Sequence, residues 1–141
     1  MKPTPEGWPQ IASAVYYNAP PEAIDWLCNA FGFEVRLKIE GADGSIQHSE
    51  LVFGQGVIMV ADAQSQAPQR SSPLAVGGAN TQSMMVFVDD VESHFTRAEQ
   101  AGAKIISALQ TFDRGADYWV DRGYEAADPE GHHWWFFQRL R

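Results

Sequence analysis

The sequence lacks several features that mark secreted, membrane-spanning or nucleic-acid-binding proteins. It has one cysteine, Cys28, which excludes an internal disulfide and is typical of a reducing compartment. No apolar run approaches the roughly 20 residues of a membrane-spanning helix, and the first six residues lack the apolar segment of a signal peptide. A net charge of −8 leaves nothing to neutralise a run of phosphates. We therefore expect a cytoplasmic protein without nucleic-acid or membrane partners, and we expect Cys28 to be filler within an apolar helix.

What is present is enough for one domain with a sizeable core, because 45% of the 141 residues are hydrophobic. Patterning in the first half predicts a strand over 11–17 and a helix that starts at Pro20-Pro21 and ends at Gly32. Three strands should follow, over residues 33–40, 45–53 and 57–62.

The second half repeats this order of elements. A strand over 83–88 precedes a helix capped by Asp89-Asp90 and ended by Gly102, and strands are expected over 104–109, 118–127 and 132–138. Residues 63–80, rich in Ala, Gln, Ser, Pro and Gly, read as a linker between modules at 8–62 and 81–140. The predicted class is α+β, with two βαβββ modules in a single domain, 1–141. Their sheets should pair into a curved, cup-like mixed sheet whose hollow is the natural ligand site.

Several short strings, in this order and spacing, resemble one known family. They are Ala23-Ile-Asp-Trp-Leu, Ala30-Phe-Gly, Asp43-Gly, His48-Ser-Glu-Leu, Val88-Asp-Asp-Val, Ala101-Gly-Ala-Lys, Asp121-Arg-Gly-Tyr and Asp128-Pro-Glu-Gly-His. From about residue 11 to 137 the chain is similar to the vicinal oxygen chelate superfamily, the glyoxalase/bleomycin resistance protein/dioxygenase family, and to its PhnB-like members. The resemblance implies the cup-like fold. It does not decide between catalysis and binding, because this fold hosts lyases, isomerases, dioxygenases, thiol transferases and non-catalytic drug binders.

The resemblance also implies four places where metal-using members carry a His, Gln or Glu. Counted from the strand ends and turn glycines, these places fall on Ala12, Val60, Ser83 and Trp135, or on Met59 if the second shifts by one. None of these side chains is a competent ligand for a divalent ion. We therefore expect no metal at these positions and no other cofactor.

Strand alternation assigns side chains to the inner face of the cup. The inner set is Ala12, Ala14, Tyr16, His48, Glu50, Val52, Ile58, Val60, Ser83, Met85, Phe87, Glu125, His133, Trp135 and Phe137; the outer set, expected beneath the helices, is Ile11, Val15, Leu51, Phe53, Met84, Val86, Val88, Trp134 and Phe136. The predicted ligand-binding residues are Tyr16, His48, Glu50, Met85, Phe87, Trp119, Arg122 and Trp135. The aromatic members could stack on a planar ligand or simply fill an interface.

The ionisable candidates each allow two interpretations. His48 and Glu50 point the same way and are candidate catalytic residues, or else ordinary polar residues on an exposed strand. Arg122 could grip a carboxylate or phosphate, although its parity points away from the cup and favours a structural pairing with Asp121. His132 and His133 should face opposite sides, and His94 should face solvent.

The favoured hypothesis is a metal-independent binder of a small hydrophobic or aromatic molecule, of the drug-sequestration type. The acidic net charge would steer cationic ligands toward it. The alternative is a metal-dependent glyoxalase-like lyase or dioxygenase with a relocated divalent site on His48, Glu50, Glu125 and His133. A third possibility is a metal-free enzyme with His48 as general base. In each case we expect a homodimer, and the linker could allow the halves to exchange between chains.

Overall fold

The computed structural model describes residues 1–141, which divide into two compact units. We call residues 1–72 module 1 and residues 73–141 module 2. The boundary between Ser72 and Pro73 falls inside the predicted linker, which contains two short 3₁₀ helices, Gln64–Gln66 and Pro73–Val76.

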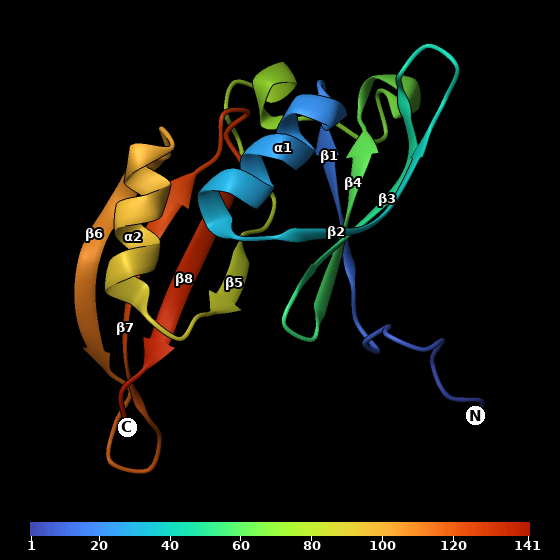
Figure 1. Ribbon diagram of the computed structural model, residues 1–141. Helices are drawn as coiled ribbons and strands as arrows, with labels where there is room; N and C mark the ends of the chain where they lie inside the picture. The colour runs from blue at the N-terminus through green and yellow to red at the C-terminus, as the bar shows by residue number, and fades with distance from the viewer. The chain divides into compact units, whose positions relative to one another are not determined.

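Module 1 is a four-stranded mixed sheet with one long helix (Figure 1). Its elements are β1 (Ser13–Tyr17), α1 (Pro20–Phe31), β2 (Glu34–Glu40), β3 (Ile46–Phe53) and β4 (Gly56–Asp62). The strand order is β1-β4-β3-β2, in which β1 runs parallel to β4 and the other pairs are antiparallel.

Module 2 has the same topology, which confirms the predicted βαβββ repeat. Its elements are β5 (Met84–Phe87), α2 (Val91–Gln100), β6 (Lys104–Asp113), β7 (Val120–Ala127) and β8 (His133–Arg139). The strand order is β5-β8-β7-β6, again with the first pair parallel. Neither long helix has the length and apolar character needed to cross a bilayer.

The helix boundaries follow from the residues that flank them. Pro20 and Pro21 occupy the first turn of α1, where their missing N–H groups cost nothing, and Gly32 ends the helix with a φ of 86°. Asp90 caps α2, because its side chain accepts a hydrogen bond from the Ser93 N–H at 3.1 Å.

Each helix covers one face of its own sheet and buries the apolar side chains on that face. In module 1 the covered side chains include Val15, Leu51 and Val60, packed with Ile24, Leu27 and Phe31 of α1. In module 2, Trp134, Phe136 and Tyr124 are fully buried with Val91 and Ala98 of α2. The other face of each sheet has no helix of its own module against it.

His94 was predicted to face solvent, and this is wrong. It is half-buried between α2 and the sheet, with its Nδ1 2.7 Å from the Tyr124 hydroxyl and its ring centroid 4.2 Å from that of Phe136. Burial raises the pKa of Tyr124 well above its usual range.

The predicted faces of β4 are also wrong by one residue. Val60 lies opposite Val15, and Ile58 lies opposite both Ser13 and Leu51, so Val60 and Ile58 share the helix-covered face. Met59 and Ala61 therefore lie on the uncovered face, opposite Ala14 and Tyr16. Ile11, expected beneath a helix, precedes β1 and is 88% exposed.

The turn between β7 and β8 is organised by one buried carboxylate. Asp128 Oδ1 accepts hydrogen bonds from the backbone N–H groups of Glu130, Gly131 and His132, each at 3.1 Å, and its Oδ2 accepts one from Trp134 Nε1 at 3.1 Å. Gly131 has a φ of +98°, which other residues rarely adopt. Asp128 thus fixes the conformation of the turn that leads into the aromatic strand β8.

Replacing this carboxylate should destabilise the protein strongly. We expect Asp128→Ala to lower the free energy of unfolding by about 2–4 kcal/mol, because four donors lose a charged acceptor in a buried setting. Urea unfolding followed by circular dichroism measures this change. Asp117→Ala, at an exposed position in the β6–β7 connection, is the matched control and should change stability by less than about 0.5 kcal/mol. Equal effects of the two substitutions would contradict this role for Asp128.

Candidate functional site

The uncovered face of module 2 is aromatic. Register pairs Met85 of β5 with Trp135 of β8, and Phe87 with Phe137, and all four side chains lie on this face. Met85 and Phe87 are about half exposed, at 52% and 51%. Large apolar side chains left open in this way are typical of a binding surface.

These side chains border a hollow of about 630 Å³. The rings of Trp135 and Phe137 are stacked at 5.4 Å with an interplanar angle of 7°, and Phe112 meets both nearly edge-on. Residues lining the hollow are Ser83, Met85, Phe112, Arg114, Tyr118, Trp119, Trp135 and Phe137. The volume is that of a small organic ligand.

A glycine on the neighbouring strand makes room for this stack. Gly123 of β7 lies opposite Phe137, and a Cβ there would collide with the Phe137 ring and approach the Phe136 carbonyl oxygen to 2.6 Å. Gly123 therefore lets the Phe137 ring lie flat against the sheet.

An ion pair between a buried carboxylate and a partly exposed arginine lies beside the same hollow. Asp121 is 0% exposed; its Oδ2 accepts a hydrogen bond from Trp119 Nε1 at 2.8 Å and a long one from Arg114 Nη2 at 3.5 Å. Its Oδ1 has no hydrogen bond of good geometry, and its ion-pair partner is Arg114 Nη2 at 3.1 Å. The Arg114 guanidinium lies over Phe112, 4.6 Å from the ring centroid, and 5.4 Å from that of Phe137. Asp121 thus holds in place two residues that line the hollow.

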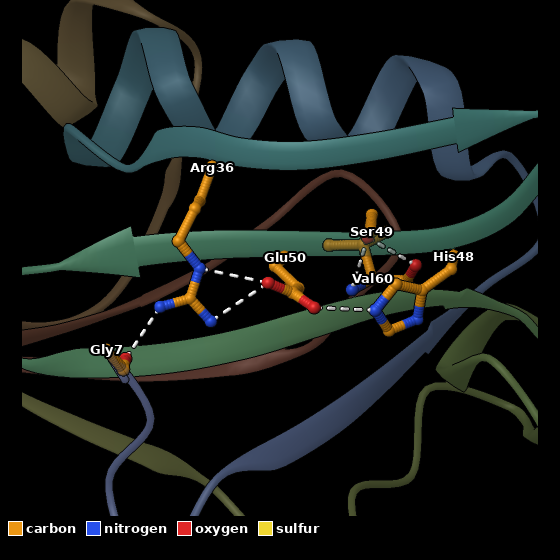
Figure 2. Close-up of polar contacts among 6 residues, drawn as sticks. All are labelled: Gly7, Arg36, His48, Ser49, Glu50 and Val60. Atoms are coloured by element: carbon orange, nitrogen blue, oxygen red, sulfur yellow. Dashed lines mark hydrogen bonds and ion pairs between the residues drawn. The ribbon is translucent and has the colours of Figure 1, made fainter. Parts of the chain in front are cut away.

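The uncovered face of module 1 carries a polar cluster instead (Figure 2). Arg36 Nε and Nη2 both lie 2.9 Å from Glu50 Oε1, and Glu50 Oε2 lies 2.8 Å from His48 Nε2. Arg36 Nη1 also donates to the Gly7 carbonyl at 2.6 Å, and its guanidinium lies over the Trp8 ring at 4.9 Å. One arginine therefore joins the N-terminal segment to the Glu50–His48 pair.

The Glu50 carboxylate is held in its charged form. The hydrogen bond from His48, followed by the hydrogen bond and charge of Arg36, lowers the pKa of Glu50 below its ordinary value. With Glu50 ionised, His48 Nε2 must be the donor, so a neutral His48 ring has Nδ1 as its acceptor. On the covered face behind, Ser49 Oγ donates to the Val60 carbonyl at 2.7 Å and accepts from the Val60 N–H at 2.9 Å (Figure 2).

The predicted ligand-binding residues fall in different places. Met85, Trp119 and Trp135 line the same hollow of module 2, and Phe87 lines a neighbouring one of about 570 Å³. His48 and Glu50 meet on module 1, where Tyr16 accepts a hydrogen bond from Arg70 Nε at 3.2 Å.

Arg122 does not join them. Its Nε lies 2.6 Å from Glu92 Oε1 of α2, so the side chain extends toward the helix-covered face. The structure also contradicts a pairing of Arg122 with Asp121, which is paired with Arg114.

The metal-ligand places are corrected by the register of β4. In module 2 the predicted place Trp135 lies opposite Met85 of the first strand. The corresponding pair in module 1 is Ala14 and Met59, so the place first assigned to Val60 belongs to Met59. The four places are then Ala12, Met59, Ser83 and Trp135, a donor set that does not fit a divalent ion. The alternative metal site proposed from the sequence used two histidines and two glutamates. Of these, His48 pairs with Glu50 within module 1, and His133 Nδ1 lies 3.6 Å from Glu125 Oε2 within module 2. Arg36 already neutralises Glu50, and its charge would repel a cation bound there.

Sequence reasoning placed Tyr118 in the strand over 118–127 but did not assign it to the ligand site. It missed Phe112 and Arg114, because it ended the preceding strand at residue 109. In the structure β6 continues to Asp113 across two register shifts. The β-prone pair Thr111-Phe112 ahead of Gly115 was the available signal. It also missed Gly7 and Arg36, whose contact joins segments far apart in the sequence and leaves no pattern in it.

Comparisons with known proteins agree on one family. The model described as Glyoxalase/Bleomycin resistance protein/Dioxygenase superfamily matches residues 9–136. The chain is 30% identical over 135 residues to the uncharacterised protein Rv0887c of Mycobacterium tuberculosis, covering 94% of this chain and 76% of that one. It is 35% identical to TioX from Micromonospora sp. ML1, with a TM-score of 0.70 over 92% of this chain and 98% of that one. A superfamily member from Sphaerobacter thermophilus, at 16% identity, has a TM-score of 0.70 over 92% and 97% of the two chains and shows likeness of fold alone.

Removing the Arg36 guanidinium, which contacts both Glu50 and the Gly7 carbonyl, should loosen the N-terminal segment. We expect Arg36→Gln to speed cleavage between Glu6 and Gly7 by a glutamate-specific protease several-fold, since the Gly7 carbonyl and the Trp8 ring lose their partner. Lys38→Gln on the same strand, whose ammonium pairs with Glu40 at 3.2 Å, is the matched control. Cleavage of both variants at the wild-type rate would show that Arg36 does not hold the segment.

The Glu50 carboxyl should titrate at unusually low pH. Its NMR-detected midpoint should lie below the ordinary glutamate value of about 4.3, and His48→Ala should move it back upward. Because folding lowers this pKa, the cluster's contribution to stability is complete above the ordinary value and is lost as pH falls through the lowered one. A midpoint that His48→Ala leaves unchanged would be inconsistent with the bond between these two residues.

Proposed function

The chain belongs to the glyoxalase/bleomycin resistance protein/dioxygenase superfamily, and from this premise we propose that it binds a small hydrophobic or aromatic molecule without using a metal ion. The proposed site is the uncovered face of module 2. The observation that carries the proposal is the stacked pair Trp135 and Phe137, open to a hollow of about 630 Å³.

The chemistry of this hollow supports binding over metal-assisted catalysis. Flat rings offer stacking, worth about 1 kcal/mol per good pair beyond burial of area. Metal chemistry in this superfamily would need nitrogen or oxygen ligands, and the corresponding positions hold Ala12, Met59, Ser83 and Trp135. Sequestration of an aromatic compound, such as a drug, is the role that these residues fit.

Calorimetry with a neutral aromatic probe tests the proposal. We expect 2-naphthamide to bind in the presence of EDTA. Trp135→Ala should weaken binding roughly 10- to 100-fold, because the probe loses a stacking surface and apolar contact area. Trp26→Phe, in α1 of module 1, is the control and should leave the affinity unchanged. Binding that appears only after a divalent metal is added would refute a metal-independent site.

A second candidate function rests on module 1. A carboxylate that orients a histidine, itself held by an arginine, is an arrangement suited to general-base catalysis. Under this alternative, His48 Nδ1 would accept a proton from a bound substrate. The proposal would then be an enzyme that needs no metal, and a bell-shaped or sigmoidal pH profile lost in His48→Gln would support it.

The proposal extends to the setting and assembly of the protein. We propose action in the cytoplasm, supported by a cysteine content of one, Cys28, as is typical of a reducing compartment. We also propose a homodimer, because both sheets leave exposed apolar side chains such as Leu37, Ile39 and Phe87. Light scattering tests the assembly, and a monomeric mass at micromolar concentration would refute it.

A further inference from the structure

We propose that the hollow of module 2 selects flat aromatic ligands that carry an anionic group, and that Arg114 is the residue that selects them. This inference rests on the function proposed above and names the class of ligand. It runs against the expectation from net charge, which at −8 favours a cation at long range.

Arg114 is the only charged side chain among those that line the hollow. Salt screens charges beyond about 8 Å at physiological ionic strength, so the distant acidic side chains act only weakly on a ligand that lies beside Arg114. Its partner Asp121 is fully buried and does not line the hollow, so a ligand meets the cation rather than the carboxylate.

The Arg114 guanidinium also has N–H groups that are not used for hydrogen bonds within the protein. Only Nη2 contacts Asp121, while Nε and Nη1 make no hydrogen bond within the protein. These N–H groups of the guanidinium can donate to a carboxylate or a similar oxyanion that lies in the hollow.

The rings beside Arg114 fix where that anionic group would lie. The guanidinium lies over Phe112 and near Phe137, which is stacked on Trp135. A ligand ring that packs against these side chains would have Arg114 within the same hollow as the partner for an anionic substituent. Asp121 acts as a positioning residue, because it holds Arg114 and Trp119 in place at once.

Three probes that share one ring system test the selection: 2-naphthoate, 2-naphthamide and 2-naphthylmethylammonium. With wild-type protein and EDTA, calorimetry should give 2-naphthoate a dissociation constant about 10-fold or more below that of the amide, with the ammonium probe weakest. Equal affinities for the three, or a preference for the cation, would overturn the role of Arg114 and leave aromatic binding standing. Failure of all three probes to bind would refute the proposed function itself and the inference with it.

Variants separate charge from folding. Arg114→Gln alone leaves a buried carboxylate unpaired and should destabilise the module. The informative variant is therefore Arg114→Gln combined with Asp121→Asn, which removes both charges. In the double variant the ratio of the amide and naphthoate dissociation constants should fall to near one. Arg114→Lys should keep part of the preference, since it retains the charge without the fork. A ratio unchanged in a folded double variant would overturn the inference.

Discussion

One constraint shapes both modules: each four-stranded sheet has a single helix, and one helix covers one face. α1 and α2 bury Val15, Leu51, Trp134 and Phe136, which supplies each module with a core. The opposite face of each sheet has no helix of its own module against it, and this is where Trp135 and Glu50 lie. The candidate sites thus follow from an architecture that leaves one face of every sheet open.

The two open faces have diverged although their positions correspond. Continuing the register of β3 and β4 sets Glu50 opposite Met59, as Glu125 lies opposite Trp135, so the two glutamates occupy equivalent places. Each has a histidine nearby, His48 at 2.8 Å and His133 at 3.6 Å. In module 1 Arg36 of β2 neutralises Glu50. In module 2 Arg114 pairs instead with Asp121, beside a cluster of aromatic rings. A duplicated scaffold therefore presents a polar cluster on one sheet and a stacking surface on the other.

The fold could be predicted from the sequence because its signals are local. Pro20-Pro21, Gly32 and Asp90 mark helix ends by backbone geometry, and alternation marks the strands of module 2 correctly. The predicted faces of β4 were wrong because positions were counted from the turn glycine, and the two turns differ in length. Gly56 is the first residue of β4, whereas Gly131 lies two residues before β8. Arg114 and Arg36 could not be predicted, because their partners, Asp121 and the Gly7 carbonyl, are set by hairpin register and by a chain segment remote in sequence.

The central claim is that the aromatic face of module 2 binds a flat molecule without a metal ion. Indole N–H resonances of the tryptophans, recorded in EDTA while 2-naphthamide is added, test it most directly. The account predicts that Trp119 and Trp135, which line the hollow, shift with the same saturating dependence on probe, while Trp26 of module 1 does not move. Resonances of Trp119 and Trp135 that stay fixed at saturating probe would contradict it.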